Sequence, residues 1–338
     1  MRHIVLAGAI AAAAALPAQA QEFYAGKTMT IIVSTGAGGS SYQLAQAFSR
    51  HMPKYIPGQP TIIVKAMPGA GNLLATNFLH NIAPKDGTTI GTINNSIPLH
   101  QALGGQGVHF DARKFHWLGS TGTYNSVAYV WHTAGIKTFK DLTEKEVILG
   151  GTGIGSSIVI YPTVMNNLLG TKFKIVLGYK STVEIDLAME RGEVQARTGS
   201  YTALASEHPD WLKDNKVVIV AQIGGKRDPL IPDIPLMDDF ATTDEARQII
   251  KLISSPIALG RPYLTPPEVP AERVALLRKA LAAALRDPGF LAEAKKMDIE
   301  IDTVSAEEIT QIVHDTINAP AKVIAAAKGF MGPAEEAR

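Results

Sequence analysis

The sequence predicts an α/β protein of two lobes, each built on a central, mainly parallel sheet flanked by helices. Short β-branched runs alternate with helical patterns, and this order favours parallel strands joined by helices. The alternation occurs twice, with strand-rich sequence over Phe115–His132 between the two units. A chain of 338 residues is also long for one hydrophobic core and suits two domains. We therefore expect two lobes, with the chain crossing between them.

The first unit contains three expected strands and two expected helices. The strands are β-branched runs at Thr30–Val33, Thr61–Ala66 and Thr89–Ile93. Apolar residues at helical spacing predict a helix over Tyr42–Met52 and a second around Leu73–Leu79.

The second unit repeats this pattern. The expected strands and helices are, in chain order, Glu146–Gly150, Ile158–Leu169 (helix), Lys172–Leu177, Val183–Arg191 (helix), Val194–Thr198 and Val217–Ile223. A long loop rich in Pro and Gly follows, and the rest of the chain is expected to be mainly helical.

The C-terminal part is predicted as helices over Arg273–Arg286, Glu307–Ile317 and Pro320–Lys328. The first carries leucines at helical spacing and is expected to stop at Asp287-Pro288-Gly289. These helices must pack on another element, and the first lobe is the expected host. The predicted domains are therefore residues 21–122 plus 224–338 for the first lobe and residues 123–223 for the second.

The N-terminal sequence MRHIVLAGAIAAAAALPAQA predicts a secretory signal peptide over residues 1–20. Arg2 gives the basic start, an apolar stretch follows, and Ala18–Ala20 forms an A-x-A cleavage site before Gln21. The stretch is too short to span a bilayer, and the alternative, a buried Ala-rich helix, does not account for this order of features. We expect an exported, periplasmic protein that does not itself span the membrane.

The composition narrows the functional classes. Lys+Arg 32 against Asp+Glu 31 gives a net charge of +1, so no basic field is available to attract nucleic acid. The chain has no cysteine, which excludes disulfides and thiol catalysis.

Catalytic and cofactor motifs are weak. Gly26–Thr28 lacks the first glycine of a P-loop, and "GTGIGSS" at Gly151–Ser157 has Ser156 where a dinucleotide fingerprint needs its third glycine. There is no G-x-S-x-G, the histidines form no metal-ligating pair, and Glu184 and Asp186 are interpreted as solvated helix residues. We expect no catalytic residue, no metal and no cofactor, and hence a binding protein rather than an enzyme.

Three loops between a strand and a helix share one chemistry, Gly36–Ser41, Pro68–Asn72 and Gly151–Ser157, and the loop Asn94–Ser96 is a candidate fourth. Glycine lets the backbone approach a ligand closely, and Ser and Asn cap helices and offer donors. A helix N-terminus adds free amides and a partial positive charge, which suits a small anion. The alternative is that these are ordinary tight turns, but three of them in two units favour a shared pocket.

The ordered set of motifs resembles the extracytoplasmic solute receptors of tripartite tricarboxylate transporters, the Bug or TctC-like family. It consists of "MTIIVSTGAGGSSYQLAQAF", "MPGAGNLLATNFL", "PKDGTTIGTINNS", "ILGGTGIGSS", "LGYKSTVEIDLAMERGEVQARTGSY" and "PPEVPAERVALLRKALAAALRDPGF". The resemblance covers essentially the whole mature chain. It implies a two-lobed, type II-like periplasmic binding protein fold with a ligand cleft between the lobes. It also implies a small organic anion as ligand and TctA/TctB-like membrane transporter subunits as partners.

The resemblance implies ligand contacts from both lobes. The first lobe would contribute Gly38, Gly39, Ser40, Ser41, Tyr42, Gly69, Ala70, Gly71, Asn72, Asn95 and Ser96. The second lobe would contribute Gly153, Gly155, Ser156, Ser157, Tyr179, Lys180, Ser181, Ser200 and Tyr201, with Asn125 and Ser126 near the crossing between the lobes.

Two positions depart from the family pattern, and one arginine stands out. Ala37 replaces a usual proline, and Tyr42 stands where an aspartate is common, which removes a partner for a ligand ammonium group. We therefore favour a di- or tricarboxylate or an aromatic acid, with Tyr42 either on the cleft wall or in the core. Arg197 either binds a second carboxylate or is a surface strand residue.

The predicted function is a periplasmic solute-binding protein that captures a small organic carboxylate for a tripartite tricarboxylate-type transporter. The alternatives are a ligand-sensing module for a membrane signalling protein, which would use the same cleft, and an exported enzyme, which would require a catalytic cluster in it.

Overall fold

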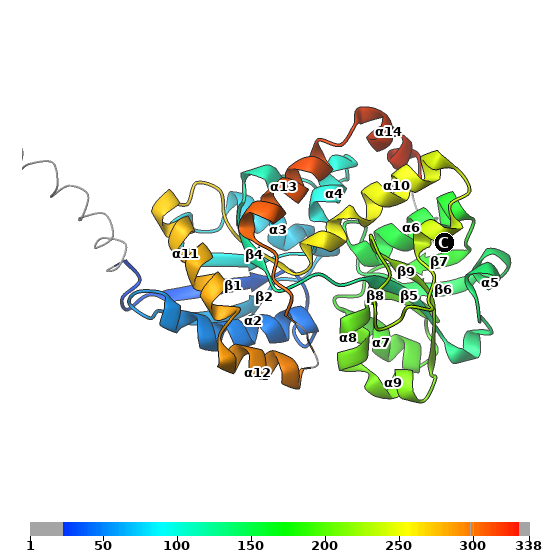
Figure 1. Cartoon of the computed structure of the whole chain (residues 1–338), viewed down its shortest axis with the longest axis horizontal. Coiled ribbons are helices and arrows are strands. Elements are labelled where there is room, and N and C mark those ends of the chain that lie inside the picture. The colour runs from blue at the N-terminus through cyan, green and yellow to red at the C-terminus, as the bar shows by residue number, and fades with distance from the viewer. Residues whose placement is uncertain (1–22, 298, 300, 331–338) are drawn as a thin grey trace, which may run out of the picture.

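The computed structural model describes residues 23–297, 299 and 301–330. The predicted signal peptide and its cleavage site at Gln21 lie outside the described residues. Within these ranges, no helix combines the length and the apolar character that crossing a bilayer requires. Figure 1 shows two sheets side by side, each among its own helices, with the first on the left and the second on the right.

The first sheet has the strand order β2-β1-β3-β10-β4. Its strands are β1 (Thr28–Val33), β2 (Thr61–Ala66), β3 (Thr89–Thr92), β4 (His116–Ser120) and β10 (Pro262–Thr265). β1 pairs in parallel with β2 and β3, whereas β10 pairs antiparallel with both β3 and β4. Four strands therefore run in one direction and β10 runs against them.

The second sheet has the same arrangement, in the order β7-β6-β8-β5-β9. Its strands are β5 (Ser126–Trp131), β6 (Val147–Gly150), β7 (Phe173–Val176), β8 (Ala196–Ser200) and β9 (Val217–Ile223). β6 pairs in parallel with β7 and β8, and β5 pairs antiparallel with β8 and β9. Each sheet is mixed, with one reversed strand, and in each that strand is the first one after the chain crosses over from the other lobe.

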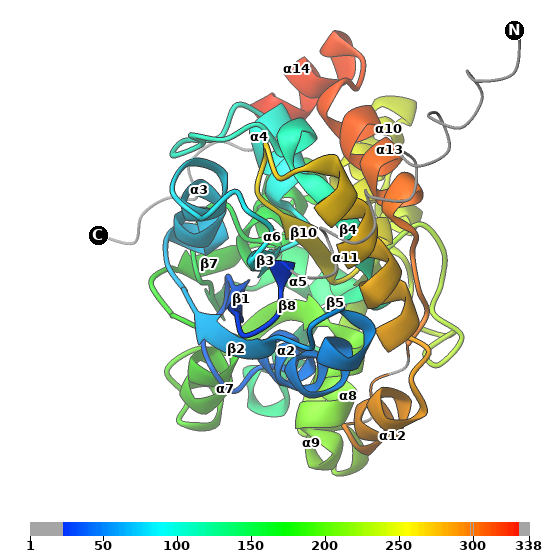
Figure 2. The same cartoon turned by 90° about the vertical axis from the view of Figure 1, so that its left-hand side faces the viewer.

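Helices cover both faces of each sheet. Around the first sheet lie α2 (Ser40–His51), α3 (Leu73–Asn81), α4 (Ile97–Ala102), α11 (Ala271–Ala284), α12 (Pro288–Lys296) and α13 (Ala306–Ile317). In Figure 2 this lobe faces the viewer. Around the second sheet lie α5 (Phe139–Glu144), α6 (Ser157–Leu169), α7 (Thr182–Glu190), α8 (Tyr201–Glu207), α9 (Pro209–Lys213), α10 (Asp244–Ser254) and α14 (Ala321–Gly329).

The interior strands β1 and β5 are largely apolar on both faces because both faces are buried. In β1, Ile31 and Val33 join the cluster with α2 and α11, whereas Ile32 joins the cluster with α3 and α13. In β5, Tyr129 packs with α7 and α9, and Val130 packs with α6. Such strands read as continuous β-branched runs rather than as alternating patterns.

The chain crosses between the lobes at positions that bear on the predicted boundaries. The chain first passes from one sheet to the other over residues 121–125, between β4 and β5, and the expected boundary after residue 122 falls in this segment. After β9, however, α10 packs in the cluster of the second sheet through Ile249, Ile250 and Ile253. Ala327 of α14 belongs to that cluster too. The lobe boundaries stay a prediction, and this packing supports a second crossing near residue 260 rather than residue 224.

The predicted elements of both alternating units are present, with ends shifted by a few residues. Three expectations for the C-terminal part need correction. The segment before α11 contains β10, which the sequence analysis missed because Pro262 begins a strand of four residues. The helix α10 was missed as well. Asp287-Pro288-Gly289 does end α11, but it also starts α12, where the Asp287 carboxylate accepts from the Phe290 amide.

Candidate functional site

A cavity of about 110 Å³ lies between the lobes, at the carboxyl ends of the parallel strands. The first lobe lines it with Ser34, Thr35, Gly36, Gly39, Ser40, Ser41, Gly69, Gly71, Asn72, Asn94 and Arg261. The second lobe lines it with Ser126, Thr152, Ser156, Ser157, Ile158, Tyr179, Lys180, Ser181, Thr182, Arg197, Gly199, Ser200 and Ala203, and Tyr124 lies on the crossing. All four predicted loops contribute, because parallel strands of one sheet end at the same edge.

Two helices point their first turns at this cavity. α2 begins at Ser40 and α6 begins at Ser157, and both residues line it. Ser156 caps α6 by accepting from the Ile158 amide. Within the described residues, the backbone amides of Ser41 and Ser157 have no hydrogen-bond partner. Free amides at two helix N-termini give the cavity a positive, donor-rich wall.

Glycine is required where the two lobes touch beside the cavity. Gly71 has a φ of +62°, and a Cβ there would lie 2.8 Å from both the Gly153 carbonyl oxygen and the Gly155 amide nitrogen of the opposite lobe. The Ser96 hydroxyl donates to the Gly155 carbonyl at 2.9 Å. These contacts hold the lobes in a closed arrangement that a side chain at position 71 would prevent.

Arg261 is the functional candidate that the sequence analysis missed. It stands next to β10, is 6% exposed and lines the cavity. Its guanidinium lies 4.5 Å from the centre of the Tyr124 ring, and Nη2 donates to Thr202 Oγ1 at 3.0 Å in the other lobe. No described carboxylate lies within ion-pair distance of it. The available signal was an arginine in an otherwise apolar segment, "SSPIALGRPYL".

Arg197 is fully buried, so the alternative of a surface strand residue is wrong. Asp186 of α7 binds it through two contacts, 2.5 Å from Nε to Oδ1 and 2.9 Å from Nη2 to Oδ2. Two of its five N–H donors are therefore occupied by an internal carboxylate, and Nη1 is the guanidinium nitrogen that Asp186 leaves without a contact. Gly199 leaves room for Nη1, since a Cβ at that position would overlap it.

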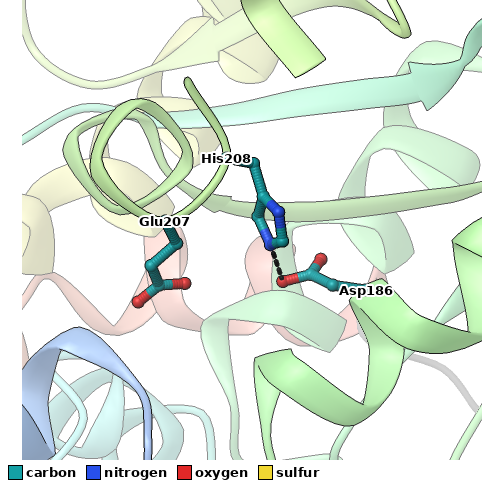
Figure 3. Close-up of side chains that lie close together, drawn as sticks. All are labelled: Asp186, Glu207 and His208. Atoms are coloured by element: carbon teal, nitrogen blue, oxygen red, sulfur yellow. Dashed lines mark hydrogen bonds and ion pairs between the residues drawn. The ribbon is translucent and has the colours of Figure 1, made fainter. Parts of the chain in front are cut away.

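Asp186 is a buried ion-pair partner, which corrects its interpretation as a solvated residue. It is 2% exposed, and His208 Nε2 lies 3.1 Å from its Oδ2 (Figure 3). Burial by itself would raise the pKa of Asp186, but the Arg197 charge and the hydrogen bonds from His208 and Arg197 lower it overall. His208 is in turn stacked on Trp211 with ring centres 3.8 Å apart.

Glu207 lies beside Asp186 and His208 but makes its contact across the cleft (Figure 3). Its Oε1 accepts from the Ser40 amide, the first of α2, at 2.8 Å. Its Oε2 is buried and has no partner in the described part of the chain. Glu207, Asp186 and His208 could meet at one ion by distance, within 4.8 Å. The Arg197 guanidinium on Asp186 would repel a metal cation there, so the arrangement favours ion pairing.

The structure brings many of the predicted site residues to the cavity. Those that line it are Gly39, Ser40, Ser41, Gly69, Gly71, Asn72, Ser126, Ser156, Ser157, Tyr179, Lys180, Ser181, Arg197 and Ser200. Those outside its lining are Gly38, Tyr42, Ala70, Asn95, Ser96, Asn125, Gly153, Gly155 and Tyr201. Ligand contact by any of them stays a prediction.

Two of the outlying residues, Tyr42 and Asn125, have structural roles instead, and a third, Asn95, is buried with its side-chain amide unpartnered in the described part of the chain. Tyr42 packs against the core cluster of the first lobe, so of its two expected orientations the structure shows the core-facing one. Asn125 donates to Gln222 Oε1 and to the Lys226 carbonyl, which ties the crossing segment to the end of β9. Asn95 is 2% exposed, and its neighbour Asn94 lines the cavity in its place.

Comparison with known proteins agrees with this geometry. A relative in Agrobacterium vitis, described as a UPF0065 protein in the TAR-I ttuE-ttuC' intergenic region, is 25% identical over 277 residues, 80% of this chain and 75% of that protein. The periplasmic binding protein BugD is 20% identical with a TM-score of 0.68, over 90% of this chain and 95% of its own.

Two further solved structures come from Rhodopseudomonas palustris. MatC with bound malate is 18% identical with a TM-score of 0.70, over 88% of this chain and 99% of its own. A protein solved with adipate is 17% identical with a TM-score of 0.68, over 89% and 97%. These likenesses show the two-lobed binding-protein fold. The model of the tripartite tricarboxylate transporter family receptor matches residues 44–328, and this chain therefore belongs to that family.

Proposed function

We propose that this protein is a periplasmic receptor that captures a small organic carboxylate and delivers it to a tripartite transporter with TctA/TctB-like membrane subunits. The observation that carries the proposal is Arg261, a buried guanidinium on the cavity wall with no described carboxylate partner. A buried cation of this kind is costly unless an anion joins it.

The rest of the cavity suits the same ligand class. Helix N-termini and glycine loops hold carboxylate oxygens through backbone amides, without a row of basic side chains. The relatives solved with malate and adipate support acids of this type as ligands. The predicted signal peptide supports the periplasmic location, and the absence of a recognisable catalytic motif in the sequence favours binding over turnover.

A thermal-shift screen of organic acids tests the proposal on the mature chain. Binding to the folded state raises the melting temperature, and a ligand at a hundred times its Kd adds about 2.7 kcal/mol. The protein should first be unfolded and refolded to remove any acid carried through purification. At least one acid should raise the melting temperature, and isothermal calorimetry should confirm one site. A panel of mono-, di- and tricarboxylates that all leave the melt unchanged would contradict the proposal.

A further inference from the structure

We propose that Arg261 is the specificity-determining residue of the cleft, which binds a second acidic group of the ligand and rejects ligands that carry a neutral amide there. This inference rests on the proposed function and adds to it the residue that selects ligands with a second negative group. The first group would lie at the loop amides and the second at Arg261.

The two cavity arginines differ in what neutralises them. Both are almost completely buried, but Arg197 has the Asp186 carboxylate at 2.5 and 2.9 Å. Arg261 has only the Thr202 and Ser200 hydroxyls and the Tyr124 ring. The charge of Arg197 is therefore neutralised by a carboxylate of the protein itself, whereas the charge of Arg261 is left for a ligand.

Because Arg261 is buried, its unpaired charge matters for ligand binding. Desolvation lowers the pKa of Arg261 from its ordinary value, although the group stays protonated at any physiological pH. The charge of Glu207 acts on Arg261, but Glu207 forms no ion pair with it and gives one oxygen to the Ser40 amide. A ligand carboxylate would bind Arg261 with two charge-assisted hydrogen bonds, which a neutral amide cannot match.

The position of Arg261 is fixed by the backbone. It follows Gly260, whose φ is +59° and whose Cβ position is filled by the Gly122 carbonyl. It precedes β10, which is paired on both sides. A guanidinium held directly next to a strand that is paired on both sides presents a constant geometry, which selectivity between similar acids requires.

Arg261 also connects ligand charge with lobe closure. It belongs to the first lobe, and its Nη2 donates to Thr202 Oγ1 in the second lobe at 3.0 Å. That contact exists only when the lobes are together. A ligand bound to the guanidinium would therefore be held by both lobes at once.

The first measurement compares isosteric ligand pairs in wild type and in Arg261→Gln. The probes are succinate, glutarate and adipate, each beside its monoamide, with affinities measured by calorimetry. Wild type should bind at least one diacid about ten- to a hundredfold more tightly than its monoamide, as expected for a hydrogen-bonded charge. Arg261→Gln should lose this preference, Arg261→Lys should keep part of it, and Arg278→Gln, which alters an arginine on α11 outside the cavity, should keep all of it.

The second measurement is the melting temperature of ligand-free Arg261→Met. A residue retained for ligand charge costs stability, so its removal should leave the melting temperature unchanged or raise it. A fall of several degrees would instead indicate a structural role and would overturn the inference.

The outcomes separate the two proposals. A diacid preference that survives Arg261→Gln overturns the role of Arg261 and leaves the receptor function intact. A wild type that binds none of the six probes contradicts the diacid inference, and if the wider acid screen is also negative, the proposed function fails with it.

Discussion

At the scale of single residues, the cavity depends on a buried ion pair that no local sequence pattern predicts. Arg197 on β8 and Asp186 on α7 are both almost completely buried, and their two hydrogen bonds satisfy most of their polar atoms. Such a pair adds little stability compared with apolar residues, but loss of one partner leaves a buried charge unpaired. Asp186 therefore keeps Arg197 in place beside the cavity.

Asp186→Asn should destabilise the protein by about 3–5 kcal/mol, because Arg197 would keep its buried charge without a carboxylate. Urea denaturation with a constant m-value would measure this loss. Asp210→Asn is the matched control, since Asp210 forms an exposed ion pair with Lys216 and should leave the midpoint unchanged. Equal midpoints for Asp186→Asn and wild type would contradict this assignment.

The same pair gives a pH dependence. The pKa of Asp186 is lower in the folded protein than in the unfolded chain, so its contribution is present above the unfolded value of about 4 and is lost as pH falls through the folded value. Asp111, whose pKa Arg113 and Gln101 help to lower to about 2 against the opposing effect of burial, acts in the same window. Stability should thus decrease below about pH 4, and less steeply in Asp186→Asn.

At the scale of elements, the N-terminus of α2 is bound by a carboxylate from the other lobe. Glu207 ends α8, and its Oε1 accepts from the first amide of α2 at 2.8 Å. The partial positive charge of the helix end favours this contact. An internal anion thus joins the two lobes at one of the sites that a ligand anion would use.

Glu207→Gln should shift the ligand-free protein toward an open form. Replacing the charge weakens the contact by about 1 kcal/mol, or about fivefold in the ratio of open to closed protein. Small-angle scattering, or a fluorophore pair with one label on each lobe, would report the change. Glu184→Gln is the control, because Glu184 accepts from the Lys180 amide within one lobe. If both variants close as wild type does, Glu207 does not link the lobes.

At the scale of the whole molecule, closure requires the backbones of two glycine loops to meet. Gly71 in the first lobe approaches Gly153 and Gly155 in the second so closely that a Cβ would lie 2.8 Å from two of their atoms. Backbone in a packed contact has no room to move aside. The absence of a side chain at position 71 therefore permits the closed cavity.

Gly71→Ala should hold the lobes apart and lower the affinity for any acid found in the screen by at least about tenfold, since 1.4 kcal/mol of steric cost suffices for that factor. Part of its effect is backbone strain at a φ of +62°. Gly170→Ala controls for the strain, because Gly170 has a φ of +74° and nothing within 4 Å of its Cβ position. Gly71→Ala should impair lobe closure and ligand affinity, whereas Gly170→Ala should not. Identical results for the two variants would show that backbone strain alone causes the loss.

The sequence by itself determined the elements of both alternating units and the loops that line the cavity. β-branched runs predicted β1, β2 and β9, since β-branched residues favour strands. In β1, which lies inside its sheet, Ile31–Val33 are apolar because both faces are buried, whereas β2 lies at the sheet edge and is mostly exposed. The glycine loops were recognisable because close backbone approach excludes side chains and therefore requires glycine, which is visible in the sequence itself. Their convergence followed from parallel topology, since such loops share one edge of a sheet.

Only the tertiary structure decided which charges face the ligand. Arg197 and Arg261 look alike in the sequence, but α7 brings Asp186 to the first and no described element brings a carboxylate to the second. Tyr42 could have turned either way on α2 until the core of the first lobe was in place. A residue's charge balance depends on neighbours distant along the chain, and these are fixed by packing rather than by local pattern.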